Sequence, residues 1–563
     1  YRLLPRRRST SSRVSAVSLL FRYSVPLTLI AVYVLLATIA IDKPGYYYDE
    51  VIHVPVAMRA LGQCDVDAAV TLQTGCFPLM QTLGYVGAVK AWLTAPLIGM
   101  FGTSVWTVRL PPIALGALAL FALWSFARRE LGGAWAALLL TLLVCDPVLL
   151  NHARLDWGPQ MIALLMRVLS LAALLRWLQT GRLFWLAVVC ATFLIGFIDK
   201  LNFIWVIVAW LAAVATVMGG TAWGRLRSGA PWQPLLAGLT LALLAWGTVT
   251  LVRRAAGLDI LGDAQTLTLG AQLAKVWNLY AQTFSGLSVL QWVFGVDVPA
   301  TPAFNVLLVV QLATAVVMLA WCRPWSPARR LLAFLTAATF YLVLAIAGTR
   351  QVGGSHHLFM IWPMPTLHLV ALVAIAAQHL GTERGRGMAL RATIALCGVI
   401  VGGTLLAWNI AMDLRYADVW RNDRDFRPLF DPAIANLGTR LETLAPDRVI
   451  AVDWGLHQPL VTLAGRTRAP HYREWTWRLI DAGPALERDD LTRAIAADVT
   501  GKRVAFVLHG PGQSVFQGAR PRLDKLLAKT QPCSTTEEDF MNAAGKTIFV
   551  IVLADYASCK PRS

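Results

Sequence analysis

The chain has little charge for its length. Asp, Glu, Lys and Arg make up 15% of its 563 residues, whereas 57% of the residues are hydrophobic. A soluble protein of this size could not cover its surface with polar groups at such a balance. Apolar stretches of about 17–25 residues recur along the first 410 positions, and each can cross a hydrocarbon core of about 30 Å. The sequence therefore predicts a polytopic α-helical membrane protein.

We expect about 11 transmembrane helices. The alternative count is 13, because the segment 82–101 could cross the membrane instead of lying along its interface. Lys90 and Pro96 within that segment favour the interfacial position. The expected spans lie at about 17–41, 110–127, 134–150, 159–178, 183–199, 202–219, 234–252, 304–322, 331–348, 359–378 and 391–411.

Acidic residues are scarcer than basic ones, 32 against 50, which leaves a formal net charge of +18. The arginines do not gather as a nucleic-acid-binding protein would need, because they lie in short segments at alternate ends of the apolar spans. Examples are residues 6–8, 128–129 and 329–330. From the positive-inside rule we expect a multi-pass protein of a bacterial inner membrane, with a cytoplasmic N-terminus and no nucleic-acid partner.

The composition changes at about residue 412, where charged residues become frequent. β-type runs at 448–453, 503–508 and 547–553 alternate with helical patterns at 432–444, 485–497 and 516–529. Such alternation is typical of an α/β fold. We therefore expect a transmembrane domain over 1–411, with a first outer loop at about 42–109, followed by a soluble periplasmic α/β domain over 412–563.

Four of the eight cysteines lie on the expected outer side. Cys64 and Cys76 share the first outer loop, and Cys533 and Cys559 share the C-terminal domain. Because that side of the membrane is oxidising, we expect two local disulfides. Unrelated free thiols are the alternative.

The first candidate site follows the first hydrophobic span. Asp49 and Glu50 are adjacent, and His53 lies close behind them. Ionisable groups near a membrane usually face a bundle interior or an aqueous cavity, and they indicate a functional site by default. A helix cap is the alternative, since Asp is a favoured N-cap residue.

Two further outer turns carry charge. The turn at 151–156 holds Arg154 and Asp156, and it has no spare length, so a carboxylate there could face the first pair. A solvated loop is the alternative. Lys200 interrupts an otherwise apolar run. A lysine at a helix end often snorkels to the interface, but beside two acidic loops it could bind a lipid phosphate.

The last outer turn combines glycines with Arg350, His356 and His357. An arginine can pair with phosphate, and histidines offer proton transfer or metal ligation. Adjacent histidines point in different directions, so joint chelation of one metal ion does not follow from the sequence.

This order of motifs resembles the GT-C superfamily of integral-membrane glycosyltransferases, which includes protein O-mannosyltransferases and the aminoarabinose transferase of lipid A. The resemblance rests on the acid pair that opens the first outer loop, the acid in the next outer turn and the lysine that closes the fifth helix. The segments 77–80, 85–90 and 101–111 are similar to the family's continuation of the first loop. The resemblance covers roughly residues 17–410 and does not extend to the C-terminal domain.

The resemblance implies an inverting transfer of a sugar from a polyprenyl-phosphate carrier to a protein, lipid or glycan acceptor on the outer face of the membrane. Asp49 would be the general base that deprotonates the acceptor hydroxyl. Glu50 and Asp156 would position the acceptor or a divalent cation. Lys200 and Arg350 would stabilise the departing phosphate.

The remaining candidates have accessory roles in this scheme. His356 or His357 would assist at the phosphate or bind metal, whereas His53, Arg154 and Lys90 would assist at the acceptor. No cofactor is certain, and a divalent metal is possible. The single acid in the second turn weakens the case that a metal is required. The candidate metal ligands are Glu50, His53 and His356.

Two other classes of function remain open. A transporter or flippase for a lipid-linked sugar would place its charges near the bilayer midplane, often within inverted repeats. Here the charges concentrate in outer loops, and the sequence shows no repeat. The other alternative is a noncatalytic assembly subunit whose outer domain recruits partners.

Overall fold

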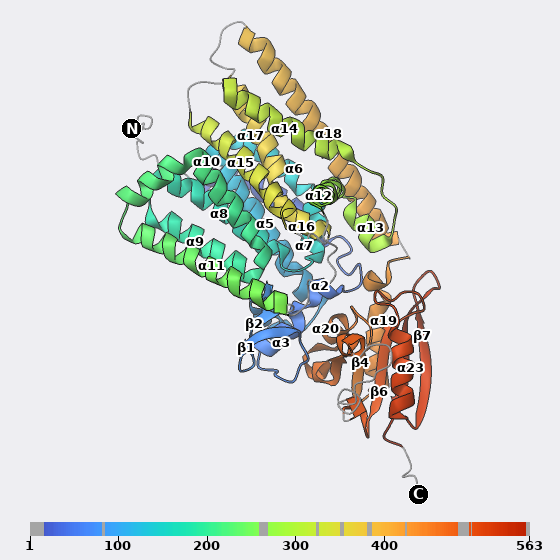
Figure 1. Ribbon diagram of the computed structural model, residues 1–563. Coiled ribbons are helices and arrows are strands. Elements are labelled where there is room, and N and C mark those ends of the chain that lie inside the picture. Colours follow the sequence, from blue (N-terminus) through green and yellow to red (C-terminus); the bar gives the residue numbers. More distant parts are fainter. Residues whose placement is uncertain are drawn as a thin grey trace.

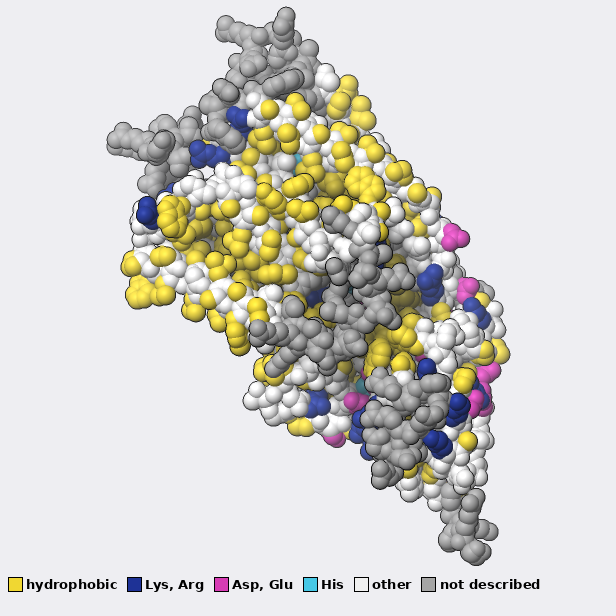
Figure 2. Space-filling view, in the orientation of Figure 1, with side chains coloured by type: hydrophobic (Ala, Val, Ile, Leu, Met, Phe, Trp, Pro, Cys, Tyr) yellow, Lys and Arg dark blue, Asp and Glu magenta, His cyan; other side chains and the backbone are white. Residues whose placement is uncertain are grey.

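A computed structural model of the protein describes residues 16–81, 85–257, 268–321, 326–349, 354–379, 386–422, 425–481, 495–496 and 498–558. A long helical bundle carries a smaller α/β domain at one end (Figure 1). Figure 2 shows a broad hydrophobic band across the bundle, with Lys and Arg side chains at its far end and again on the α/β domain. This distribution is that of a membrane-spanning bundle with a more polar domain at one end.

The described residues contain eight helices that are long and apolar enough to cross a membrane, or nine if one pair bent by 58° is a single span. The bent pair is α6 (Gly133–Val144) and α7 (Pro147–Leu155). Seven of the spans lie in α5 (Val105–Glu130), α8 (Gln160–Thr180), α10 (Ile204–Ser228), α11 (Trp232–Gly257), α14 (Pro302–Trp321), α15 (Pro327–Ala347) and α18 (Arg386–Asn422). The eighth, Ser355–Ala377, joins α16 (Ser355–Leu358), η3 (Phe359–Ile361) and most of α17 (Met364–His379).

Two further apolar helices, α1 (Ala16–Thr38), of which Tyr23–Thr38 is the apolar segment, and α9 (Leu183–Asp199), correspond to the other expected spans. The predicted class, a polytopic helical membrane protein with a C-terminal α/β domain, is therefore confirmed. The interfacial candidate forms α4 (Val89–Phe101), whose 13 residues are too few to cross. The last helix, α18, continues beyond the expected boundary at 411.

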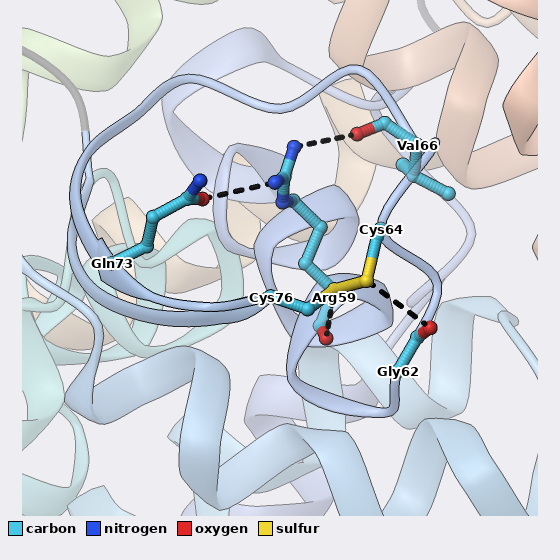
Figure 3. The surroundings of a disulfide bond; sticks show 6 residues. All are labelled: Arg59, Gly62, Cys64, Val66, Gln73 and Cys76. Carbon is cyan, nitrogen blue, oxygen red and sulfur yellow. Dashed lines mark hydrogen bonds between the residues drawn. A yellow bond between two sulfur atoms is a disulfide. The ribbon is translucent and has the colours of Figure 1, made fainter.

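The first outer loop is a small folded unit. It contains α2 (Tyr48–Val51), α3 (His53–Ala60) and an antiparallel sheet of β1 (Val70–Thr74), β2 (Phe77–Gln81) and β3 (Val86–Gly87). Cys64 and Cys76 form a disulfide, and Arg59 donates hydrogen bonds to the carbonyl of Val66 and the side chain of Gln73 beside it (Figure 3). These links hold the end of α3 against the sheet.

Of the other two outer cysteines, Cys533 is disulfide-bonded, and Cys559 lies outside the described residues.

The α/β domain has a five-stranded sheet in the order β5-β4-β6-β8-β7. β4 runs parallel to β5 and β6, whereas β8 runs antiparallel to β6 and β7. Its elements are η4 (Pro428–Phe430), α19 (Ala433–Leu444), β4 (Arg448–Ala451), α20 (His457–Arg468), η5 (Ala469–His471), β5 (Tyr472–Glu474), α21 (Thr476–Asp481), β6 (Arg503–His509), α23 (Ala519–Thr530), β7 (Ser534–Met541) and β8 (Thr547–Asp555). The helix expected at 485–497 lies mostly outside the described residues.

One face of this sheet attaches the domain to the bundle. Its side chains share a buried cluster with α19, α20 and the loop helices α3 and α4. Polar contacts support that packing, because the backbone N–H of Glu474 donates to Asp67 at 2.9 Å and Gln63 donates to the carbonyl of Arg466 at 2.9 Å. The α/β domain therefore packs against the first outer loop.

Candidate functional site

The helices α2 and α7 lie at the end of the bundle that faces the α/β domain (Figure 1), and they carry or precede Asp49, Glu50 and Asp156. The backbone N–H of Gly158, just after α7, donates to the carbonyl of Asp49 at 3.1 Å. The N–H of Leu201, between α9 and α10, donates to the carbonyl of Tyr85 at 2.9 Å, and a bridge pairs Val86 with Lys200. The first loop, the second turn and the lysine turn are thus joined through their backbones.

Asp49 is half-buried and hydrogen-bonded to the Tyr47 side chain. Burial raises the pKa of its carboxyl, while the positive charges of Lys200 and Lys90 lower it by a smaller amount. Among the described residues, no lysine, arginine or histidine nitrogen lies within 4 Å of it. Asp49 is therefore a carboxylate with proton-accepting capacity in a partly enclosed place.

Glu50 has a different environment, although it is next in the chain. It is 1% exposed, and both carboxylate oxygens accept from the Arg109 guanidinium, at 2.5 and 3.0 Å. Arg109 also donates to the carbonyls of Ile41 and Pro44, at 2.6 and 2.9 Å. This bidentate pair anchors α2 to the start of α5 and to the end of the first span.

Asp156 is held in a similar way by Lys90. The Lys90 ammonium lies 2.7 Å from the Asp156 carboxylate, and both side chains are almost fully buried. Lys90 also donates to the backbone carbonyls of Glu50 and Asp156, at 3.4 and 3.3 Å. The other carboxylate oxygen of Asp156 accepts from the N–H of Met161 at 3.0 Å. Lys90 thus links α4 to both acidic turns.

Lys200 is 5% exposed and has no carboxylate oxygen within 4 Å among the residues that the structure describes. Its ammonium lies where a Cβ on Gly158 would approach to 2.9 Å, and Gly158 has a φ of +67°. A larger residue at 158 would displace the lysine. Burial lowers the pKa of Lys200, and the charges of Asp49, Asp199 and Asp156 oppose that shift. The site therefore contains a buried cation whose nearby anions do not neutralise it by contact.

The short helix α16 (Ser355–Leu358) contributes two histidine rings to the site, and tryptophan rings from other segments lie beside them. The His356 and His357 rings are 4.2 Å apart. Trp157 lies 6.5 Å from His356, edge to face, and Trp205 lies 6.0 Å from His357. Arg350, the arginine expected in this turn, lies outside the described residues.

Two of the accessory candidates are buried away from these rings. Arg154 donates to the carbonyls of Ile39, Ala40 and, at 3.0 Å, Lys43. Its guanidinium stacks over Trp420 at 5.0 Å, so it caps the end of α1. His53 is 1% exposed and lies near the backbone of Glu50.

The metal candidates do not come together. Within the described parts of the chain, no group of three His, Cys, Asp or Glu side chains could hold a metal ion. Glu50 is already paired with Arg109. This donor set does not fit a metal ion held by the protein.

Sequence reasoning missed two contributors to the site. Asp199 is fully buried beside Lys200, and neither of its carboxylate oxygens has a hydrogen-bond partner among the described residues. The signal was present, because Asp199 is an acid in an apolar run. The other is Trp454 of the α/β domain, whose ring lies 5.1 Å from Tyr48. The sequence carries no signal for that contact between distant segments.

Comparison with known proteins finds one matching family and several structures of similar fold. Residues 86–246 match the family described as dolichyl-phosphate-mannose-protein mannosyltransferase. The crystal structure of ArnT from Cupriavidus metallidurans in the apo state superposes with a TM-score of 0.55 at 14% identity, covering 95% of this chain and 99% of that chain. The same protein bound to undecaprenyl phosphate gives a TM-score of 0.50 at 13% identity, covering 96% and 100%. None of the curated proteins matches significantly.

The chain has the GT-C fold. The resemblance inferred from the order of the outer motifs is therefore confirmed, and at these identities the superpositions establish the fold alone. The family match includes Lys90, Arg109, Asp156 and Lys200. It begins after Asp49 and Glu50, so it does not include the acid pair.

Proposed function

We propose that the protein is an inverting glycosyltransferase that moves a sugar from a polyprenyl-phosphate carrier to an acceptor on the outer face of a bacterial inner membrane. The observation that carries the proposal is the juxtaposition of Asp49 with Lys200, a proton-accepting carboxylate and a buried cation that contacts no anion within the described parts of the chain. The ArnT structure with undecaprenyl phosphate supports a lipid-phosphate donor.

In this reaction Asp49 accepts the proton of the acceptor hydroxyl as its oxygen attacks the anomeric carbon. A raised pKa makes this carboxylate a stronger base than an exposed aspartate. The new carbon–oxygen bond forms on the face opposite the departing phosphate, so the anomeric configuration inverts. The bond from the sugar to the phosphate oxygen breaks, and its electron pair leaves with the polyprenyl phosphate.

Lys200 stabilises the charge that develops on that phosphate. A cation in a water-poor site contributes more than the same cation in solution, because its field is less screened. We assign His356 and His357 to the same proposed phosphate subsite, since their turn lies beside Trp157 and Trp205. Arg350 lies outside the described residues, and its role at the phosphate stays a prediction from the sequence.

The two buried ion pairs position these groups. Glu50 with Arg109 holds the short helix that bears Asp49, and Asp156 with Lys90 holds the second turn. We therefore assign Glu50, Asp156 and Lys90 to positioning, and Arg154 to support of the first span. His53 remains a proposed accessory residue near the acceptor.

Orientation completes the proposal. Arg128 and Arg129 lie in the last turn of α5, whereas Arg109 and the site lie at its start. The positive-inside rule then assigns the N-terminus to the cytoplasm and the α/β domain to the periplasm. The acceptor is a protein, lipid or glycan that reaches the site from the periplasm.

The test compares Asp49→Asn with Asp42→Asn, which changes an exposed acid in the same loop. Both variants are purified in nanodiscs with undecaprenyl-phosphate-linked hexoses and pentoses as donors and an outer-membrane extract as acceptor. We expect Asp49→Asn to lose transfer by at least about a hundredfold, the usual scale of a general base, while it still binds donor. Asp42→Asn should transfer normally.

Transfer by Asp49→Asn at the wild-type rate would refute the base assignment. Movement of intact donor across the bilayer without transfer would identify a flippase. Donor binding with neither activity, together with recruitment of a partner enzyme, would identify an assembly subunit.

A further inference from the structure

Three parallel strands of the α/β domain each lead into an aromatic side chain. Trp454 follows β4, Trp477 follows β5, and Phe516 lies in the loop after β6. The carboxyl ends of parallel strands lie at one edge of a sheet, and that edge is where ligands of open α/β sheets bind. The three rings are therefore gathered at the edge where a ligand site is expected.

These rings connect the domain surface to the proposed catalytic site. Trp477 lies 5.4 Å from Phe516, Phe516 lies 6.1 Å from Trp454, and Trp454 lies 5.1 Å from Tyr48, between ring centroids. Tyr48 precedes Asp49 in the chain. We name Tyr48, Trp454, Phe516 and Trp477 the aromatic strip. Its outer rings remain accessible, because Trp477 is 44% exposed and Phe516 is 38% exposed.

A buried carboxylate holds the middle of the aromatic strip in place. Asp453, 1% exposed, accepts from the N–H of Trp454 at 2.9 Å and from the hydroxyl of Ser514 at 2.5 Å. It also accepts from the N–H of His509 at 3.4 Å. One side chain thus ties the loop after β4 to the loop after β6. Exposed aromatic rings on fixed loops lose little entropy when they bind a ligand.

We propose that the outer rings of the aromatic strip, Trp477 and Phe516, bind the sugar rings of a carbohydrate acceptor whose terminal hydroxyl reaches Asp49. Tyr48, which is 5% exposed, supports these rings from beneath through its contact with Trp454. This inference rests on the proposed function, whose acceptor class it names. A pyranose presents a flat face of C–H groups that packs on an aromatic ring, and edge hydroxyls that pair with polar neighbours. Ser514 and Gln513 supply such neighbours in the loop that carries Phe516.

Two other acceptor classes fit the aromatic strip less well. A peptide in extended conformation binds through main-chain hydrogen bonds along a free strand edge, whereas the aromatic strip is built from loop and helix-start residues. A lipid chain needs a surface within the hydrophobic band, whereas the outer rings belong to the α/β domain beyond the bundle.

The test measures binding of three hexasaccharides to the full-length protein in nanodiscs. One is built from glucose, one from N-acetylglucosamine and one from mannose. We expect tryptophan fluorescence to report binding of at least one. Trp477→Ala and Phe516→Ala should each weaken that binding at least about fivefold, and Trp477→Phe should restore it. The matched control is Phe77→Ala, because Phe77 is a 45% exposed ring of the first outer loop that packs on Trp92.

A second readout separates this inference from the proposed function. With a donor that wild type uses, Trp477→Ala should raise the acceptor KM at least about fivefold and leave kcat within twofold. Normal acceptor KM in both strip variants, with transfer intact, would overturn the inference alone. Absence of transfer in wild type, with hexasaccharide binding that depends on Trp477, would overturn the proposed function alone. Failure of all three hexasaccharides to bind wild type would also overturn the inference.

Discussion

The ion pair between Glu50 and Arg109 gives a prediction whose size follows from burial. Both side chains are almost fully buried, and two guanidinium nitrogens donate to the two carboxylate oxygens. Removal of one partner leaves the other charge buried without compensation, at a cost of about 3–5 kcal/mol. Arg109→Met and Glu50→Gln should therefore each lower the free energy of unfolding by about that amount.

The double variant Glu50→Gln/Arg109→Met should cost much less than the sum of the single changes, because it leaves no unpaired charge. Unfolding is measured by SDS titration of the purified protein in mixed micelles. The matched control is the exposed pair Arg520–Glu537, with 44% of each side chain accessible. Arg520→Met there should cost no more than about 1 kcal/mol.

Two results would refute this reasoning. One is a loss below about 1 kcal/mol for Glu50→Gln, which would show that the buried pair is not formed. The other is strict additivity of the two single changes. Either outcome would mean that the Glu50 carboxylate is available to contact the acceptor directly.

Three further predictions follow from groups outside the membrane spans. Burial raises the pKa of Asp49, so the base is lost to protonation at a higher pH than for an exposed aspartate, and the acid limb of the transfer rate should lie above about pH 4; a limb below it would contradict the burial. Cys64→Ser/Cys76→Ser opens a loop with a sequence separation of 12 and should lower the free energy of unfolding by about 3 kcal/mol in SDS titration, whereas an unchanged midpoint would show that the bridge is dispensable. Burial also raises the pKa of Glu474, so the folded state keeps a proton that the unfolded state releases. Wild type should therefore lose stability relative to Glu474→Gln as the pH rises through that pKa. Thermal unfolding at several pH values tests this, and a gain of stability with rising pH would contradict the prediction.

The bundle could be predicted from the sequence because each span is a continuous apolar run. The positions of Asp49, Asp156 and Lys200 at one end of the bundle also followed, because alternating arginine segments set the side on which each turn lies. These arguments need only local composition and order along the chain.

The different environments of Asp49 and Glu50 could not be predicted from the sequence. Glu50 pairs with Arg109, which lies 59 positions away in the chain. No pattern in the sequence predicts whether such a distant arginine pairs with Asp49 or with Glu50. Arg154 is a similar case, since its partners are carbonyls of a helix end more than 110 positions earlier. Contacts of this kind depend on the packing angles of helices.

The α/β domain was predicted as a class, but its part in the site was not. Trp454 reaches Tyr48 only because α19 and α20 pack against the first outer loop. Alternating strands and helices indicate a sheet with helices, and they say nothing about the surface on which that sheet will dock.

The most direct test of the central claim is a structure of the protein with undecaprenyl phosphate linked to a sugar through a non-cleavable phosphonate. We predict that the phosphonate oxygens lie within hydrogen-bond reach of the Lys200 ammonium. We also predict that the anomeric carbon faces the Asp49 carboxylate, with room for one hydroxyl between them. A phosphonate bound away from Lys200, or a sugar whose attacked face points away from Asp49, would contradict the account.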